Sequence, residues 1–190
     1  MPFTEKFLTS KYVNWLNDPE VVRYSRHRFQ SHTIKSCEKY YQSYLETPNY
    51  LWAIVVRDSE HGHIGNMNAY VDVNNSVADI GILIGEKKVW GRGYGKEAWV
   101  AACDFLLRIE EFRKVTAGTL SVNTAMLKIM QYAGMVEDGR RIRHHTFEGQ
   151  EVDLMNKALF REDWNSRAAE FQHILKNLIT LLFNIYVSHI

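Results

Sequence analysis

Three alternating glycines, set between an apolar run and a helical pattern, constrain the fold of this chain more than any other feature. Residues 80–84 (IGILI) are short and β-branched, which predicts a buried strand. Gly91, Gly93 and Gly95 follow, and a continuous helical pattern begins after them. Glycines between a strand and a helix allow a sharp turn and leave backbone N–H groups bare. Because a helix N-terminus carries free N–H donors and partial positive charge, the expected ligand is an anion, most often a phosphate.

Two common phosphate-binding loops do not fit this stretch. The P-loop pattern G-x-x-x-x-G-K-[ST] fails because Glu97 follows Lys96, where a hydroxyl should hold magnesium. The dinucleotide pattern G-x-G-x-x-G fails because the third glycine counted from Gly91 comes one position early. A glycine-rich turn between a strand and a helix, with no ligand, is the alternative interpretation.

A longer pattern covers the glycines. Residues 90–95 read W-G-R-G-Y-G, which resembles the acetyl-CoA pyrophosphate loop of the GNAT N-acetyltransferases, Q/R-x-x-G-x-G/A. Trp90 stands where the family often has Gln or Arg, a departure of small consequence because backbone amides do the binding. The variant W-G-x-G-Y-G is similar to the branch that acts on ribosomal-protein amino termini, polyamines and amino sugars. The family's second landmark is an Asn after the fifth strand and a helix ending in Y-x-x-x-G-F. It corresponds to Asn123 and to residues 132–135 (YAGM), with a shorter Tyr–Gly spacing and Met for Phe.

The predicted elements follow the order of the GNAT fold. Strands are expected at 3–8, 51–57, 63–72, 77–84, 115–122, 140–147 and 151–160, and helices at 10–16, 19–24, 34–45, 96–110 and 124–133. Residues 136–139 (VEDG) are expected to turn. The resemblance implies an α/β (α+β) GNAT domain over residues 1–164, with a mixed central sheet of about seven strands and helices on both faces.

Residues 165–190 extend past the usual end of the family. Apolar side chains recur there at helical spacing, which predicts a C-terminal amphipathic helix that needs a partner surface. The helix has too many polar residues to span a bilayer. Packing on its own domain, formation of a homodimer and association with a membrane surface are the three alternatives.

Composition bounds the remaining possibilities. The 190 residues suit one domain, and the net charge of +1 gives no indication of nucleic-acid binding. Cys37 and Cys103 are far apart, which favours reduced thiols and a cytoplasmic protein. The first residues show no basic and apolar signal-peptide regions. Because neither C-x-x-C nor H-E-x-x-H occurs, no metal is expected.

The resemblance implies an enzyme, an acetyl-CoA-dependent N-acetyltransferase with acetyl-CoA as its cosubstrate. Backbone groups of Ile82, Leu83 and Ile84 would contact the pantetheine and the thioester. Asn123 would contact the pantetheine arm, and Lys128 would approach the adenosine end. The pyrophosphate would rest on a loop of five residues: Arg92, Gly93, Tyr94, Gly95 and Lys96.

The chemistry requires two proton transfers. A lysine-like amine has a pKa of about 10.4, so it is mostly protonated at pH 7 and must lose a proton before it attacks, whereas the CoA thiolate leaves more easily when it is protonated. Tyr132 is the predicted acid, and a packed helical tyrosine is the alternative. Asp79, at the start of its strand, is the predicted base through a water chain, and a solvated strand-edge carboxylate is the alternative. His144, His145 and Glu151 are further candidates, and water alone can also serve.

Two cationic clusters bear on the acceptor. One holds Arg23, Arg26 and Arg28 and the other holds Arg140, Arg141 and Arg143, where a polyamine site should offer acidic residues instead. Arginine matches phosphate and carboxylate geometry, so the favoured acceptor is a nucleotide-linked amino sugar. The predicted substrate contacts are Arg26, Arg28 and His144. A solvated basic loop is the alternative for the first cluster. Acetylation of a protein amino terminus and a non-catalytic acyl-CoA sensor or scaffold are the alternative functions.

Overall fold

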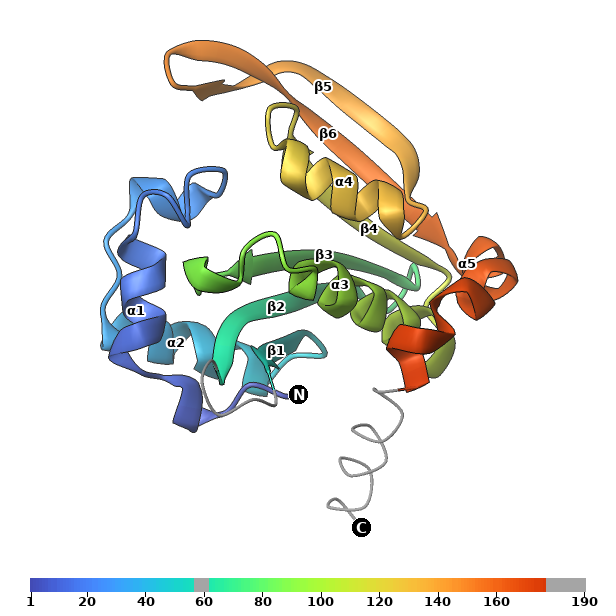
Figure 1. The fold of residues 1–190 in the computed structure, drawn as a ribbon, viewed down its shortest axis with the longest axis horizontal. Coiled ribbons are helices and arrows are strands. Elements are labelled where there is room, and N and C mark those ends of the chain that lie inside the picture. Colours follow the sequence, from blue (N-terminus) through green and yellow to red (C-terminus); the bar gives the residue numbers. More distant parts are fainter. Residues whose placement is uncertain (57–61, 177–190) are drawn as a thin grey trace. The chain divides into compact units, whose positions relative to one another are not determined.

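The computed structural model describes residues 1–56 and 62–176, in two compact units. The N-terminal unit comprises residues 1–73 and 79–94, and the C-terminal unit comprises residues 74–78 and 95–190. Figure 1 labels the elements of both units. Among the described helices, none combines the length and the apolar character needed to cross a membrane.

The N-terminal unit holds a pair of helices and three strands. Helix α1 (Ser10–Asn17) and α2 (Ile34–Leu45) are separated by the short 3-10 helix η2 (Arg26–Phe29). Strands β1 (Tyr50–Val55), β2 (His63–Asp72) and β3 (Val77–Ile84) follow, then the 3-10 helix η3 (Lys87–Val89). Helix α2 begins where the sequence indicates, because Thr33 and Ser36 form a reciprocal capping box.

The strand expected at residues 3–8 is wrong. Glu5–Phe7 form a 3-10 helix, η1, and only Pro2 makes an isolated bridge, to Trp52. Phe3 and Phe7 are both buried. Their spacing of four residues fits one face of a helix as well as one face of a strand, so the sequence did not distinguish the two structures. The helix expected at 19–24 is also wrong, since those residues form turns.

A cluster of aromatic and apolar residues forms the core of the N-terminal unit. Strand β1 pairs antiparallel with β2 from Tyr50↔Ala69 to Val55↔His63, and helix α2 contacts both α1 and β1. The core lies among these elements and consists of buried side chains: Phe3, Phe7, Tyr12, Trp15, Leu16, Cys37 and Ala53.

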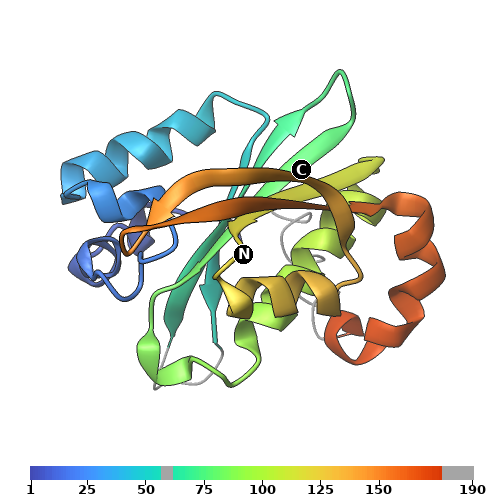
Figure 2. The same cartoon turned by 90° about the horizontal axis from the view of Figure 1, so that it is seen from above.

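The C-terminal unit is built around a long hairpin, drawn in orange in Figure 2. Helix α3 (Tyr94–Asp104) runs into a π-type turn, η4 (Phe105–Ile109), and β4 (Lys114–Leu120) follows. Helix α4 (Thr124–Tyr132) precedes β5 (Val136–Phe147) and β6 (Gln150–Phe160). The turn expected at residues 136–139 is wrong, because β5 already pairs with β6 at Val136↔Ala158 and bulges at Glu137/Gly139.

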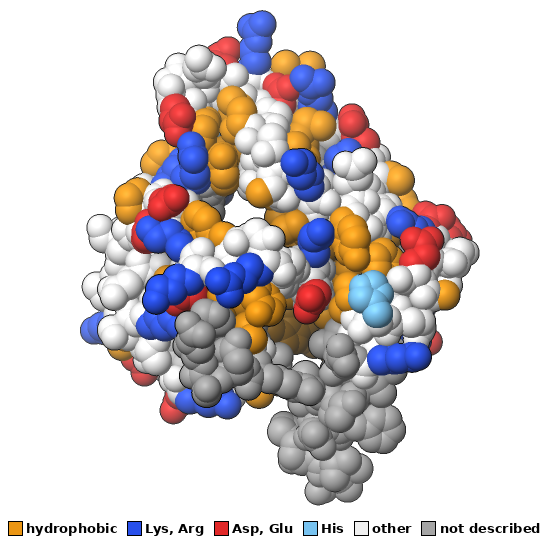
Figure 3. All heavy atoms as spheres, viewed as in Figure 1, with side chains coloured by type: hydrophobic (Ala, Val, Ile, Leu, Met, Phe, Trp, Pro, Cys, Tyr) orange, Lys and Arg blue, Asp and Glu red, His pale blue; other side chains and the backbone are white. Residues whose placement is uncertain are grey.

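The described residues contain six strands in the order β1-β2-β3-β4-β6-β5, one fewer than expected. The missing strand is the one predicted at residues 3–8. On the face that Figure 3 shows, Lys and Arg side chains are interspersed with Asp and Glu side chains, in keeping with the net charge of +1.

The beginning of the predicted tail packs on the C-terminal unit. Helix α5 (Arg161–Arg167) and the 3-10 helix η5 (Ala168–Phe171) follow β6, and the chain is helical again up to residue 176. Trp164, Phe171, Ile174 and Leu175 are buried. The rest of the predicted amphipathic helix, 177–190, lies outside the described residues, so the domain boundary after 164 and the dimer through the tail stay predictions.

Candidate active site

The glycine loop has the backbone conformation that its glycines indicated. Gly91 and Gly93 have φ of +76° and +94°, and a Cβ at either position would meet nothing within 4 Å. Helix α3 begins at Tyr94, two residues before the expected start at Lys96. The N–H groups of its first turn have no acceptor inside the helix. Arg92 N–H donates to Val89 O at 3.3 Å. The loop therefore offers an anion the helix N-terminus and open space above two glycines.

Trp90 holds the loop to the end of β3. Its Nε1–H donates to Ile84 O at 2.9 Å. Gly85 N–H and Glu86 N–H both donate to Ile64 O, at 2.9 and 3.0 Å, which marks a β-bulge at the end of β3. The indole thus gives a structural reason for a tryptophan where the family pattern often has Gln or Arg.

Salt bridges fix η3, which lies between β3 and the loop. Lys87 Nζ lies 2.8 Å from Asp18 Oδ2 and 3.0 Å from Glu20 Oε2. The hydrogen bond to Lys87 is the main reason why the pKa of Asp18 is below its usual value. Lys11 pairs with Glu86 at 3.2 Å.

The three residues predicted to contact the pantetheine and thioester of acetyl-CoA are consecutive at the end of β3. Ile82, Leu83 and Ile84 are all half-buried, and the Ile84 carbonyl is engaged by the Trp90 indole. Gly65 on β2 passes so close that a Cβ there would lie 2.2 Å from Leu83 O. Asp79, near the start of β3, is exposed.

Asn123 caps α4, as the sequence indicated. Its Oδ1 accepts from Met126 N–H at 3.3 Å, and its Nδ2 donates to Thr119 Oγ1 at 3.0 Å. Lys128 and Tyr132 are one turn apart on the exposed side of the same helix. The predicted pantetheine, adenosine and acid residues are thus all carried by α4 of the C-terminal unit.

Tyr132 and Lys96 are brought together. Lys96 Nζ lies 4.9 Å from the centre of the Tyr132 ring, and that ring contacts Phe171 edge-on at 5.5 Å. Tyr132 is 37% exposed, whereas Met130, four residues before Gly134, is 1% exposed. Because two residues correspond to about 200° around a helix, these side chains point to opposite sides. Among α4 residues, Thr124 and Tyr132 carry hydroxyl groups and Lys128 carries an ammonium group.

Sequence reasoning missed the support behind Tyr132. Phe171 stacks on Trp164 with 5.2 Å between ring centres, and Trp164 Nε1–H donates to Asp104 Oδ1 at 3.0 Å. Gly134 has a φ of +85°, and a Cβ there would lie 1.6 Å from Arg167 Nη1. The sequence identified Gly134 as the end of a helix, but the space that it leaves for Arg167 depends on a contact across 33 residues.

The predicted substrate contacts belong to different units. Arg26 and Arg28 lie on η2 of the N-terminal unit, where Arg28 donates to Ser25 O at 3.0 Å and stacks 4.3 Å from the Phe29 ring. His144 lies on β5 of the C-terminal unit, is exposed, and approaches Arg141 at 3.5 Å.

Asp153 organises the bulge of the closing hairpin. It accepts from Arg143 N–H at 2.6 Å and from Arg140 Nε at 2.7 Å. The hydrogen bond from Arg143, followed by that from Arg140, holds the pKa of Asp153 below its usual value. Arg140 is therefore committed to an ion pair within the hairpin.

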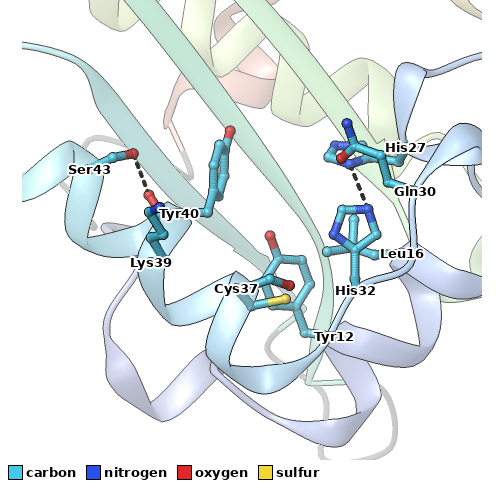
Figure 4. Close-up of a pocket in the computed structure, with 10 residues that line it drawn as sticks. Tyr12, Leu16, His27, Gln30, His32, Cys37, Lys39, Tyr40 and Ser43 are labelled. Atoms are coloured by element: carbon cyan, nitrogen blue, oxygen red, sulfur yellow. Dashed lines mark hydrogen bonds between the residues drawn. The ribbon is translucent and has the colours of Figure 1, made fainter.

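A cavity between the first two helices of the N-terminal unit is shown in Figure 4. Its volume is about 350 Å³. His27 Nδ1 and His32 Nε2 are 3.1 Å apart at its wall, and the hydroxyl groups of Tyr40 and Tyr44 are 2.7 Å apart. Burial, followed by the bonds to Tyr44 and Tyr70, raises the pKa of Tyr40. The lining residues come from α1, η2, α2 and the segments between them: Tyr12, Leu16, His27, Gln30, His32, Ser36, Cys37, Lys39, Tyr40 and Ser43.

The described residues hold no cluster of three or more potential metal-ligating His, Cys, Asp or Glu side chains. The described residues offer a glycine loop at a helix N-terminus, a half-buried strand end beside it, and a separate cavity lined by polar side chains that include Lys39.

Comparison with known proteins identifies the class. The family model "Acetyltransferase (GNAT) domain" matches residues 2–136, so the chain belongs to the GNAT acetyltransferase family. It is an acetyltransferase with acetyl-CoA as its cosubstrate, as the loop predicted. No curated protein matches the chain by sequence.

Solved structures show the same fold. Ribosomal-protein-S5-alanine acetyltransferase from Vibrio fischeri superposes with a TM-score of 0.74 at 15% identity, covering 86% of this chain and 93% of that one. Spermidine N-acetyltransferase from Vibrio cholerae, in complex with CoA and spermine, gives 0.74 at 16% identity, covering 86% and 95%. A GNAT acetyltransferase from Bacillus anthracis gives 0.71 at 17% identity, covering 85% and 93%. The predicted fold class is confirmed.

Proposed function

We propose that this enzyme moves the acetyl group of acetyl-CoA to a primary amine on an anionic small molecule, such as a nucleotide-linked amino sugar. The amine would enter the cavity between α1 and α2, which we call the acceptor pocket, lined as described above. The spermidine acetyltransferase and the ribosomal-protein acetyltransferase share the fold but, at 15–16% identity, do not determine the acceptor.

The charge of the pocket lining carries the proposal. None of the ten lining residues is Asp or Glu, and Lys39 is a cation at its rim. A polyamine carries several ammonium groups, and each would lose solvation in this pocket without gaining a carboxylate partner. A phosphate or carboxylate on the acceptor would instead be attracted by Lys39 and by the nearby arginines of η2.

The donor-handling roles follow the family pattern and are part of the proposal. The backbone from Arg92 to Lys96, which leads into the first turn of α3, would hold the pyrophosphate, because free N–H groups at a helix N-terminus bind anions. Ile82, Leu83 and Ile84 would contact the pantetheine and thioester, with Asn123 and Lys128 on the pantetheine and adenosine. Tyr132 would protonate the leaving sulfur, and Asp79 would accept the amine proton through water.

A panel of amines tests the acceptor class. Release of free CoA thiol would be followed with UDP- and dTDP-linked amino sugars, spermidine and an alanine-terminated peptide. The amino sugars should turn over fastest, and Lys39→Gln should raise KM for them while leaving KM for acetyl-CoA unchanged. A preference for spermidine would refute the proposal.

Protein amino-terminal acetylation remains the second candidate, because η2 carries an exposed apolar side chain that a polypeptide can cover. Phe29 is 73% exposed beneath the Arg28 guanidinium. A preference for the peptide, lost in Phe29→Ser, would establish this alternative. If no amine released CoA from a preparation that binds acetyl-CoA, the protein would be a sensor or scaffold.

A further inference from the structure

Two histidines share a hydrogen bond at the wall of the acceptor pocket, labelled in Figure 4. His27 Nδ1 and His32 Nε2 are 3.1 Å apart, and the rings meet edge-on with 4.8 Å between centres. Both residues line the pocket. The pair is thus placed where an acceptor group would enter, and its geometry leaves one outer nitrogen free on each ring: Nε2 of His27 and Nδ1 of His32.

Hydrogen bonds fix the backbone at both histidines. Asn17, the last residue of α1, accepts from His32 N–H at 2.8 Å and donates to His32 O at 2.8 Å. Ser25 Oγ accepts from His27 N–H at 3.2 Å and donates to Val22 O at 3.2 Å. The two hydrogen bonds between Asn17 and His32 and the two made by the Ser25 hydroxyl group beside His27 support the geometry of the shared hydrogen bond.

Burial favours the uncharged form of both rings. Burial, followed by the proximity of His32, lowers the pKa of His27, and burial lowers the pKa of His32. No carboxylate lines the pocket to favour an imidazolium. The titratable or charged groups that line the pocket beside the pair, or stand with it on η2, come from three elements: Tyr12 of α1, Cys37, Lys39 and Tyr40 of α2, and Arg26 and Arg28 of η2.

The hydrogen bond fixes how the two tautomers are related. If His27 Nδ1–H donates, its Nε2 carries a lone pair and His32 Nδ1 carries a proton. If His32 Nε2–H donates, the outer nitrogens exchange these states. One outer nitrogen is therefore always ready to accept a proton while the other is ready to release one.

We propose that His27 and His32, in place of Asp79, form a proton relay that deprotonates the acceptor ammonium; this rests on the proposed function. The N–H bond of the ammonium breaks, its electron pair stays on nitrogen to attack the thioester carbonyl, and the proton binds to the outer nitrogen that carries the lone pair. The shared hydrogen bond passes a proton to the second ring, whose outer N–H gives its proton to water. Exchange of the outer protons with water in the emptied pocket restores the first tautomer.

The relay makes a kinetic prediction that a structural role does not. Wild-type kcat/KM for the amine should stay level between the lowered histidine pKa and the pKa of the acceptor amine. Without the relay only the free amine reacts, so kcat/KM should rise about tenfold per pH unit up to the pKa of that amine. His27→Gln and His32→Gln should lower kcat/KM about 100-fold at pH 7, the usual range for a lost general base.

The kinetic test uses acetyl-CoA and a UDP-linked 4-amino sugar on the full chain, with His173→Gln as the matched control. His173 is exposed on the C-terminal unit and lies outside the proposed machinery. We expect both pocket variants to keep the wild-type KM for acetyl-CoA and to approach the wild-type rate as pH rises. A deficit that is equal at every pH, or no deficit, overturns the relay.

A second measurement needs no turnover. Long-range proton–nitrogen NMR on the full chain reports the tautomer of each ring. We expect both rings to be neutral at pH 7 and either substitution to shift the nitrogen signals of the other histidine. Two rings that titrate independently near the ordinary value of about 6.5 overturn the relay. Absence of turnover with every amine of the panel would refute the proposed function, whereas turnover with a wild-type pH profile in both variants would refute the relay alone.

Discussion

Alanine substitutions at two neighbouring glycines should separate backbone strain from ligand binding. Gly93 has a φ of +94°, in the region that L side chains rarely adopt, whereas Gly95 lies in the first turn of α3 and is not among the residues with positive φ. Gly93→Ala should therefore destabilise the protein by about 1–2 kcal/mol. Gly95→Ala should stabilise it by up to about 1 kcal/mol, because alanine favours the helix.

The two variants should differ in stability by roughly 1–3 kcal/mol. For a chain of this length each kcal/mol moves Tm by about 2–4 °C, so their melting temperatures should lie roughly 2–12 °C apart. A Cβ at Gly93 would meet no neighbouring atom within 4 Å, so this cost comes from the backbone and not from a clash. Differential scanning calorimetry on the free protein measures it.

Acetyl-CoA should also bind more weakly to Gly93→Ala than to Gly95→Ala, for a different reason. Relaxation of Gly93→Ala away from positive φ would re-aim the amides that follow it, and loss of one hydrogen bond to a charged group is worth about 1.5–3 kcal/mol. Titration calorimetry should show Kd raised roughly 10- to 100-fold. Gly95→Ala should bind acetyl-CoA as the wild type does. The reasoning is refuted if Gly93→Ala keeps its affinity, or if Gly95→Ala is the weaker binder of the two.

Three further predictions concern the C-terminal unit. Tyr132→Phe should lower kcat about 100-fold without changing KM for acetyl-CoA, as expected for a lost general acid; an unchanged kcat with a raised KM would instead make Tyr132 a wall of the cofactor site. Phe171→Ala should cost roughly 3–5 kcal/mol in urea unfolding, because it removes a buried ring that touches Tyr132; a loss below about 1 kcal/mol would mean that the tail is not docked. Asp153 has a pKa below its unfolded value, so its stabilisation is present above about pH 4 and is lost as pH falls through the lowered pKa. Asp153→Asn should therefore show a flatter dependence of Tm on pH in acid, and parallel curves would contradict the ion pair with Arg140.

The sequence predicted those features that local chemistry determines. Thr33 and Asn123 cap the helices that their side chains indicated, and the glycines at 91 and 93 adopt the backbone angles that only glycine adopts readily. The glycine loop lies at the start of α3, where the family pattern predicted a helix N-terminus. Each of these features depends on residues that are close together along the chain.

Features that depend on long-range packing were not predictable. Phe3 and Phe7 could share one face of a short strand, but both enter the core with a 3-10 helix, Glu5–Phe7, between Phe3 and the rest of the chain. The histidine pair requires Asn17, and the Tyr132 ring requires Phe171, which follows it by 39 residues. The arginine clusters in the sequence indicated an anionic acceptor. That no Asp or Glu lines the pocket could be established only from the folded structure.

The acceptor pocket is made from one continuous part of the chain, residues 12–43, whereas the loop proposed for acetyl-CoA lies at residues 92–96. Evolution can therefore exchange the first segment between relatives and change the amine that is chosen without altering the residues proposed to bind acetyl-CoA. Four positions limit such grafts, because Tyr12, Trp15, Leu16 and Cys37 also belong to the core that anchors both helices. A hybrid that keeps those four side chains and replaces the rest of the segment should inherit the substrate preference of its donor.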